Sequence, residues 1–165
     1  RRKLTEYYKF IKESSDKLSA FKENCQKVEK FLMEGFKYSC RKRDINFFTI
    51  KKGSTIVHVF IQDYDEKDSL VCCRAYVVYG AELSYKLLKQ LLLMNSEDLR
   101  FGKFGIDKNG YIILDQVMLG NTLDREELMS TVKEICMVAD ELDNELINQY
   151  GGKTALECFI EENKQ

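Results

Sequence analysis

Few residues of this sequence have the types and spacing that acid, base or nucleophilic chemistry requires. The sequence contains one histidine, His58, which lies in the β-branched and aromatic run of residues 55–60 that predicts a strand. A serine or cysteine nucleophile needs an imidazole nearby as its general base. A histidine in the middle of a strand is more often a packed structural residue, and we assign His58 that role.

Six cysteines offer thiol chemistry, but their spacing favours a structural role. They are Cys25, Cys40, Cys72, Cys73, Cys136 and Cys158. No pair has the C-x-x-C spacing of a zinc site or a redox centre, and neighbouring residues such as Cys72 and Cys73 point to opposite faces of a strand. We therefore expect reduced thiols, no metal site, no cofactor and no catalytic residues.

The charged clusters are typical of solvated surfaces. Residues 63–68 alternate carboxylates but lack the glycine and the final glutamate of a calcium-binding loop. The carboxylates between residues 126 and 145 fall on the polar side of a predicted helix. Arg41, Lys42 and Arg43 form the sharpest basic cluster, on a predicted loop beside Phe47 and Phe48. An RNA contact at this cluster remains an alternative function.

Length and composition place the chain among single globular domains of the cytoplasm. It has 165 residues, of which 44% are hydrophobic, with a net charge of -1 and a pI near 6.0. This charge balance disfavours binding to nucleic acid or to an anionic membrane. No apolar run reaches the ~18 residues that a membrane helix requires, and the first residues lack a secretory signal pattern.

Hydrophobic periodicity divides the first half of the chain into helix and then strands. Residues 4–35 have helical spacing, with an expected break at Ser14, Ser15 and Asp16 because these residue types favour helix caps. From residue 46 the period changes to two. Strands are predicted at 46–51, 55–62 and 70–79, the first two joined by a turn at Gly53.

A leucine-rich helix is predicted over about residues 84–94. Leu83, Leu87, Leu91 and Met94 form one stripe, which Leu88 and Leu92 broaden. More apolar residues are present than one stripe can bury, so we expect burial on more than one side. Leu88 and Leu92 are our candidates for a contact between two copies of the chain.

A second hairpin and a long helix complete the prediction. Strands at 101–106 and 111–117 flank the Asn109-Gly110 turn signal, and a helix runs from its cap at Asp124 to Gly151. Its stripe, which includes Ile135, is expected in the core, with a dimer seam as the alternative. The order α(α)βββαββα defines an α+β fold with an antiparallel sheet. Residues 1–22 form an N-terminal helical extension and residues 23–165 the domain.

Strand alternation separates two faces of the predicted sheet. The core face consists of uniformly apolar residues: Val57, Val59, Ile61, Val71, Cys73, Ala75 and Val77. The other face mixes large apolar groups with polar ones, and its candidates for binding a client are Ile56, His58, Phe60, Cys72, Arg74 and Tyr76. Such a face is either covered by a helix of the same chain or left open as an interface.

The second half of the chain resembles a known family. Residues 95–114, with the segments Leu123-Asp124-Arg125-Glu126-Glu127-Leu128 and Tyr150-Gly151-Gly152, are similar to YbjN-like proteins, which share the fold of type III secretion chaperones. The resemblance covers about residues 24–152. It implies a homodimeric, non-enzymatic module that binds a protein or peptide client. The chain departs from the family pattern in its N-terminal extension, which could cover the client surface.

The preferred function is therefore a chaperone, adaptor or regulatory module that binds protein or peptide. Two alternatives belong to other classes: an RNA-associated factor that uses Arg41, Lys42 and Arg43, and a small enzyme with an unrecognised site.

Overall fold

A computed structural model describes the backbone of residues 2–65 and 67–162 and, apart from residues 2–11, 13 and 162, their side chains. These residues fold as the predicted α+β arrangement around one antiparallel sheet. The elements in chain order are α1 (Arg2–Gly35), β1 (Cys40–Asp44), β2 (Phe47–Lys52), β3 (Thr55–Asp63), β4 (Ser69–Tyr79), α2 (Tyr85–Glu97), β5 (Lys103–Ile106), β6 (Ile112–Leu119), α3 (Arg125–Tyr150), β7 (Lys153–Thr154) and α4 (Ala155–Glu162).

The sheet has the strand order β1-β2-β3-β4-β6-β5, and β7 pairs with the end of β4. The first four strands follow one another as antiparallel neighbours. After α2 the chain returns as the predicted hairpin, which joins the sheet through pairing of β6 with β4. Gly53 and Gly110 have positive φ values of 58° and 85° in the two hairpin turns, a conformation that glycine adopts without steric cost.

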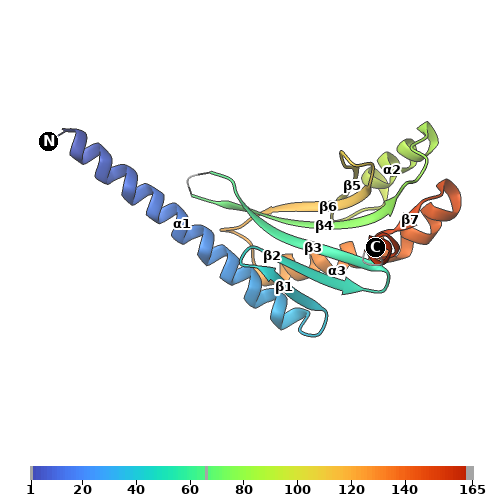
Figure 1. The fold of residues 1–165 in the computed structure, drawn as a ribbon, viewed down its shortest axis with the longest axis horizontal. Helices are drawn as coiled ribbons and strands as arrows, with labels where there is room; N and C mark the ends of the chain where they lie inside the picture. Colours follow the sequence, from blue (N-terminus) through green and yellow to red (C-terminus); the bar gives the residue numbers. More distant parts are fainter. Residues whose placement is uncertain (1, 66, 163–165) are drawn as a thin grey trace.

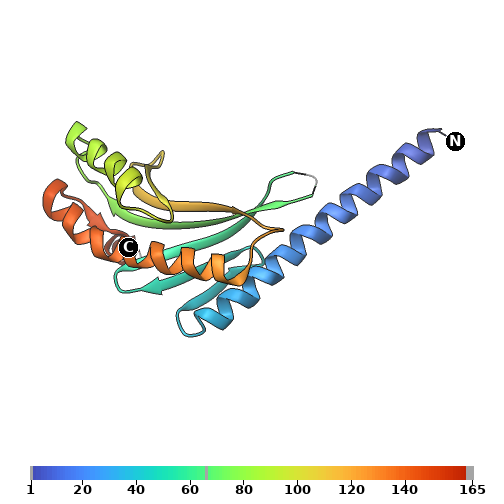
Figure 2. The ribbon, with the colours of Figure 1, turned by 180° about the vertical axis from the view of Figure 1, so that it is seen from behind.

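Helices α1, α2 and α3 lie on one side of the sheet and α4 on the other (Figures 1 and 2). The core lies between the sheet and α3. The predicted core face is confirmed, because every one of its residues is at most 2% exposed: Val57, Val59, Ile61, Val71, Cys73, Ala75 and Val77.

Helix α3 follows its sequence prediction closely. The Asp124 carboxylate caps it by accepting a hydrogen bond of 2.8 Å from the backbone N–H of Glu127, and Gly151, with φ of 74°, ends it. Leu128, Val132, Ile135, Ala139 and Leu146 are fully buried, whereas Leu142 is only partly buried. The stripe therefore packs on the sheet of its own chain and does not form a seam for a partner.

Among the described side chains of helix α1, those of its second half anchor the helix to the domain. Cys25, Val28 and Leu32 reach the core, while the first turns extend beyond the sheet (Figure 1). Polar contacts fix the point where the helix meets the sheet. The Asn24 amide donates 2.8 Å hydrogen bonds to the Ser69 hydroxyl and to the side-chain oxygen of Asn121.

The predicted break in this helix is wrong. One helix runs from Arg2 to Gly35 and passes through Ser14, Ser15 and Asp16, all of which are exposed. An exposed serine or aspartate lowers helix stability by only about 0.5 kcal/mol relative to alanine. The lysines and glutamates around these residues are strong helix formers, so the helix continues.

Three elements differ from the predicted order. Arg41, Lys42 and Arg43 lie in β1, an edge strand that pairs with β2, and not in a loop. Four strands therefore precede α2. After Gly151 and Gly152 the chain forms β7 and α4, neither of which was predicted.

A buried carboxylate also departs from the prediction. Asp143 was expected on the solvated side of α3, yet it is 1% exposed. The Ser54 hydroxyl, in the turn between β2 and β3, lies within hydrogen-bond distance of both Asp143 and Asp140. Asp140 also accepts a 3.0 Å hydrogen bond from the Ser54 N–H. This contact explains how a charged residue type is accommodated there, since buried polar groups require partners.

The packing of α3 predicts the effect of a cavity. Ile135 is fully buried, so Ile135→Ala should lower the free energy of unfolding by about 2 to 5 kcal/mol, measured by urea denaturation. Met137, on the same helix but 40% exposed, provides the control, and Met137→Ala should change stability by less than about 0.5 kcal/mol. Equal effects of the two substitutions would contradict this packing.

Candidate functional site

The side of the sheet opposite α3 carries the six residues predicted to bind a client. We call this side the open face; it includes Ile56, His58, Phe60, Cys72, Arg74 and Tyr76. The structure brings them together, because β3 and β4 pair with His58 opposite Arg74 and Phe60 opposite Cys72. Cys72 is 6% exposed, and the other five are half-buried.

One end of the open face is apolar. Phe60 lies opposite Phe47 on β2, and Cys72 lies opposite Val117 on β6. Leu70 and Leu119 form the next cross-strand pair. Val117 and Leu119 are 48% and 46% exposed, high values for adjacent apolar side chains on a sheet. We call these two residues, with Phe47, Phe60 and Leu70, the apolar end.

Sequence reasoning misses Phe47, Val117 and Leu119 in this surface. It places Phe47 beside the basic cluster and assigns no face to the strand of Val117. The signal was the alternation of Ile113, Asp115, Val117 and Leu119 along β6, which continues the mixed pattern of β4.

A polar row crosses the sheet beside the apolar end. It runs from Arg41 and Thr49 through His58 and Arg74 to Asp115. Arg74 donates through Nε and Nη2 to one carboxylate oxygen of Asp115. The two side chains are 30% and 27% exposed, so this ion pair lies at the surface of the sheet and contributes modestly to stability.

His58 is packed among aromatic rings, as its structural assignment predicted. Its ring centroid lies 5.3 Å from that of Phe47 and 5.3 Å from that of Tyr76, both in edge-on geometry. Burial lowers the pKa of His58, and the nearby charges of Arg43 and Arg74 lower it further. The imidazole is therefore neutral near pH 7 and acts as an aromatic packing group.

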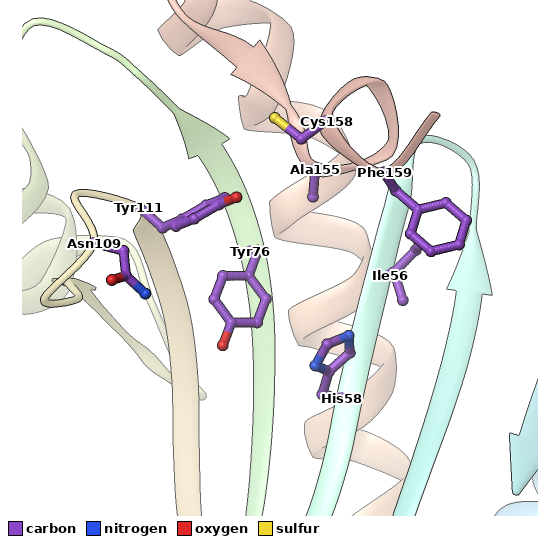
Figure 3. A pocket seen from close by; sticks show the side chains of 8 residues that line it. All are labelled: Ile56, His58, Tyr76, Asn109, Tyr111, Ala155, Cys158 and Phe159. Carbon is purple, nitrogen blue, oxygen red and sulfur yellow. The ribbon is translucent and has the colours of Figure 1, made fainter. Parts of the chain in front are cut away.

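Helix α4 covers the other end of the open face. A pocket of about 290 Å³ separates it from the sheet, between Ile56, His58 and Tyr76 on the strands and Ala155 and Phe159 on the helix (Figure 3). A helix of the same chain therefore covers the open face at this end, as one of the two alternatives predicted, but it does not cover the apolar end. Helix α1 extends away from the open face, and the side chains of Leu4, Tyr8 and Ile11 lie outside the described residues.

The second predicted surface, on α2, is also exposed. Leu87 and Leu91 face the core, whereas Leu88, Leu92 and Leu93 are 39%, 68% and 52% exposed. The expectation that this helix is buried on more than one side is therefore wrong within a single chain. Helix α2 lies at the outside of the fold (Figure 2), and its buried residues are Leu87 and Leu91.

The described residues contain no group of three or more His, Cys, Asp or Glu residues that could hold a metal ion. Burial raises the pKa of Cys136 to about 11 and raises that of Cys73 as well, so neither thiol is an activated nucleophile. In the acidic loop, Asp65 accepts hydrogen bonds from the backbone N–H groups of Lys67 and Asp68, which is a turn-forming role. Among the described residues, no helix is long and apolar enough to cross a membrane.

An α+β domain with one packed and one partly open sheet face, whose open face combines apolar and polar side chains, defines a protein-binding module. A family model described as "T3SS (YopN, CesT) and YbjN peptide-binding chaperone 1" matches residues 23–158. The chain belongs to this family, which confirms the resemblance found in the sequence.

Comparison with solved structures supports the fold. A chain in the "Crystal Structure of the ExsC-ExsE Complex" superposes with a TM-score of 0.56 and 20% sequence identity. The match covers 73% of this chain and 94% of that chain. A search of curated proteins found no match.

The environment of His58 predicts how stability depends on pH. Because its pKa is lower in the folded protein than in the unfolded chain, the unfolded chain binds the proton more readily below pH 6.5. The free energy of unfolding should decrease as pH falls from about 6.5 toward the pKa of His58 in the folded protein, by at most about 1.4 kcal/mol per pH unit. Above about pH 6.5 the protonation of His58 should no longer change the free energy of unfolding.

Urea denaturation between pH 8 and 5 measures this effect as the difference between the parent protein and His58→Gln. Since the chain has one histidine, its imidazole resonance in a proton NMR titration reports the pKa directly. A pKa at or above 6.5 would contradict the buried position of His58 beside Arg43 and Arg74.

Proposed function

We propose that this protein binds a segment of a client protein on the open face and performs no catalysis. The exposed apolar end, at Phe47, Phe60, Val117 and Leu119, carries the proposal. Exposed adjacent apolar side chains on an otherwise well-packed domain mark a surface that binds another molecule. Membership of a peptide-binding chaperone family supports it, as does the likeness to a chain from a complex of two proteins, ExsC and ExsE.

The physical basis of binding is burial of the apolar end by apolar client side chains. Full burial of one aliphatic or aromatic side chain contributes about 1.5 to 3 kcal/mol, so several half-exposed residues supply enough for weak to moderate affinity. Polar groups in the adjacent row, Thr49 among them, orient the client through hydrogen bonds. We infer that no cofactor takes part.

The proposal also places residues 1–22 outside the binding domain, as a helical extension of residues 23–165. We place the protein in the cytoplasm, where the thiols of Cys25, Cys40, Cys72, Cys73 and Cys136 remain reduced in the core.

The three basic residues of the RNA alternative, Arg41, Lys42 and Arg43, do not form one patch. On β1, Lys42 points toward α1 and forms an ion pair with Glu29 at 2.6 Å. Arg41 and Arg43 lie on the other side of the sheet, where they line one pocket with Thr49 and His58. The three adjacent charges are thus divided between two sides of the sheet, which weakens the argument for one phosphate-binding surface.

Client binding predicts which substitutions abolish it. Peptides selected from a random phage-displayed library against the parent protein should be rich in apolar residues. The double variant Val117→Asp with Leu119→Asp should weaken their binding at least about tenfold in fluorescence anisotropy, because it places charge in the apolar end. Met137→Asp, a change at a 40% exposed residue of α3, should leave it unchanged. Enrichment no better than on an unrelated protein, or equal binding by both variants, would refute the proposal.

We also propose that two copies associate through α2, where Leu88 and Leu92 are exposed beside Leu93. Leu92→Asp should shift the parent protein from dimer to monomer in sedimentation equilibrium, since it buries an unpaired charge in the contact. Met137→Asp is again the control and should remain dimeric. A parent protein that is monomeric at high concentration would exclude this contact.

A further inference from the structure

A second groove crosses the open face between α4 and the first two strands, and its lining has one sign of charge. We call it the basic groove: it is lined by Arg41, Arg43 and Lys51 and by the apolar side chains of Phe47, Ile56 and Phe159, and its volume is about 790 Å³. Of the described residues that line it, none carries a carboxylate. The groove borders the apolar end through Phe47.

The two guanidinium groups are held in place by neutral oxygen atoms. Arg43 donates through Nε to the Thr49 hydroxyl at 3.1 Å, and Arg41 donates through Nη1 to the backbone carbonyls of Tyr38 and Cys40 at 3.1 and 2.9 Å. These hydrogen bonds hold the guanidinium groups in place, but neutral oxygen atoms do not neutralise their positive charge. Among the ion pairs formed between described side chains, none includes Arg41, Arg43 or Lys51, in contrast to the Arg74–Asp115 pair.

The acidic side chains of α4 that the structure describes, Glu157 and Glu161, have other partners. Glu157 accepts hydrogen bonds from the N–H and hydroxyl of Thr154, and Glu161 pairs with Lys153 at 2.8 Å. Helix α4 therefore adds an apolar wall to the groove, while β1 and β2 add a cationic one. Burial lowers the pKa of His58, in the middle of the sheet, and the nearby charges of Arg43 and Arg74 lower it further.

We propose that the basic groove selects an acidic client segment. One apolar side chain of the segment packs beside Phe47, Ile56 and Phe159, and flanking Asp or Glu carboxylates meet Arg41, Arg43 and Lys51. This inference rests on the proposed function and adds the chemical class of the client. A peptide fits better than a nucleic acid because apolar side chains line one wall of the groove and a neighbouring aliphatic surface, Val117 and Leu119, continues from it.

The test compares two synthetic peptides of equal length, one alternating Leu with Glu and one alternating Leu with Lys. At low salt the parent protein should bind the acidic peptide about tenfold more tightly in fluorescence anisotropy, as three surface charge pairs allow, and added salt should reduce the difference. Charge reversal by Arg41→Glu, Arg43→Glu and Lys51→Glu together should reverse the preference. Lys12→Glu, Lys22→Glu and Lys30→Glu, at exposed positions of α1, change the net charge equally and should preserve it.

Two further measurements keep the test decisive. If the charge-reversed variant fails to fold by circular dichroism, the corresponding Arg→Gln and Lys→Gln variant should still abolish the preference. The His58 imidazole resonances should shift in NMR spectra when the acidic peptide binds, because His58 lines this groove. Unchanged His58 resonances with bound peptide would overturn the assignment of this groove.

The outcomes separate this inference from the proposed function. Equal affinity for the two peptides, or a preference that the three substitutions leave intact, overturns the acidic-segment inference while library-selected peptides still test the apolar end. If the library selection against the parent protein also yields no peptides that bind it, the proposed function itself is refuted. If an oligouridylate displaces the acidic peptide and binds more tightly through the same three residues, the ligand is nucleic acid and the inference is overturned.

Discussion

The antiparallel pairing of β3 with β4 is the constraint on which the other features depend. Its register sets Val57 opposite Ala75 and Val59 opposite Cys73 on the face that packs against α3. The same register sets His58 opposite Arg74 on the other face. A slip of one residue would exchange the two sets, placing charge in the core and valines in solvent. Core packing therefore also determines which side chains a client meets.

Polar contacts fix the helices relative to this strand pair. Ser54, in the turn before β3, meets the carboxylates of Asp140 and Asp143 on α3. Ser69, at the start of β4, accepts from Asn24 on α1. Each contact joins the end of a central strand to a helix on the packed side; the Asn24–Ser69 contact is buried and the Ser54 contacts are partly buried. The helices are thereby directed to one face, and the apolar end on the other remains accessible.

Much of the fold and about half of the candidate surface could be predicted from the sequence. Alternation in β3 and β4 identified both faces, and the caps of α3 were readable from Asp124 and Gly151. Strand β1 was missed because its residues, including Arg41 and Arg43, are charged on both sides, so no apolar alternation marks an edge strand. Helix α4 was missed because eight residues after two glycines carry too little periodic signal. Its position across the sheet depends on tertiary contacts that local patterns do not contain.

The short connection before α4 has a thermodynamic consequence for any client that extends past the apolar end. Strand β7, of two residues, pairs with the end of β4 and holds α4 next to Ile56 and Tyr76. A segment tethered so closely competes at an effective concentration of about millimolar or higher. The affinity of a client that displaces α4 is multiplied by the fraction of molecules in which α4 is released, whereas the affinity of a client confined to Phe60, Val117 and Leu119 is not reduced in this way. The length of the client footprint thus sets whether binding is coupled to release of the C-terminal helix.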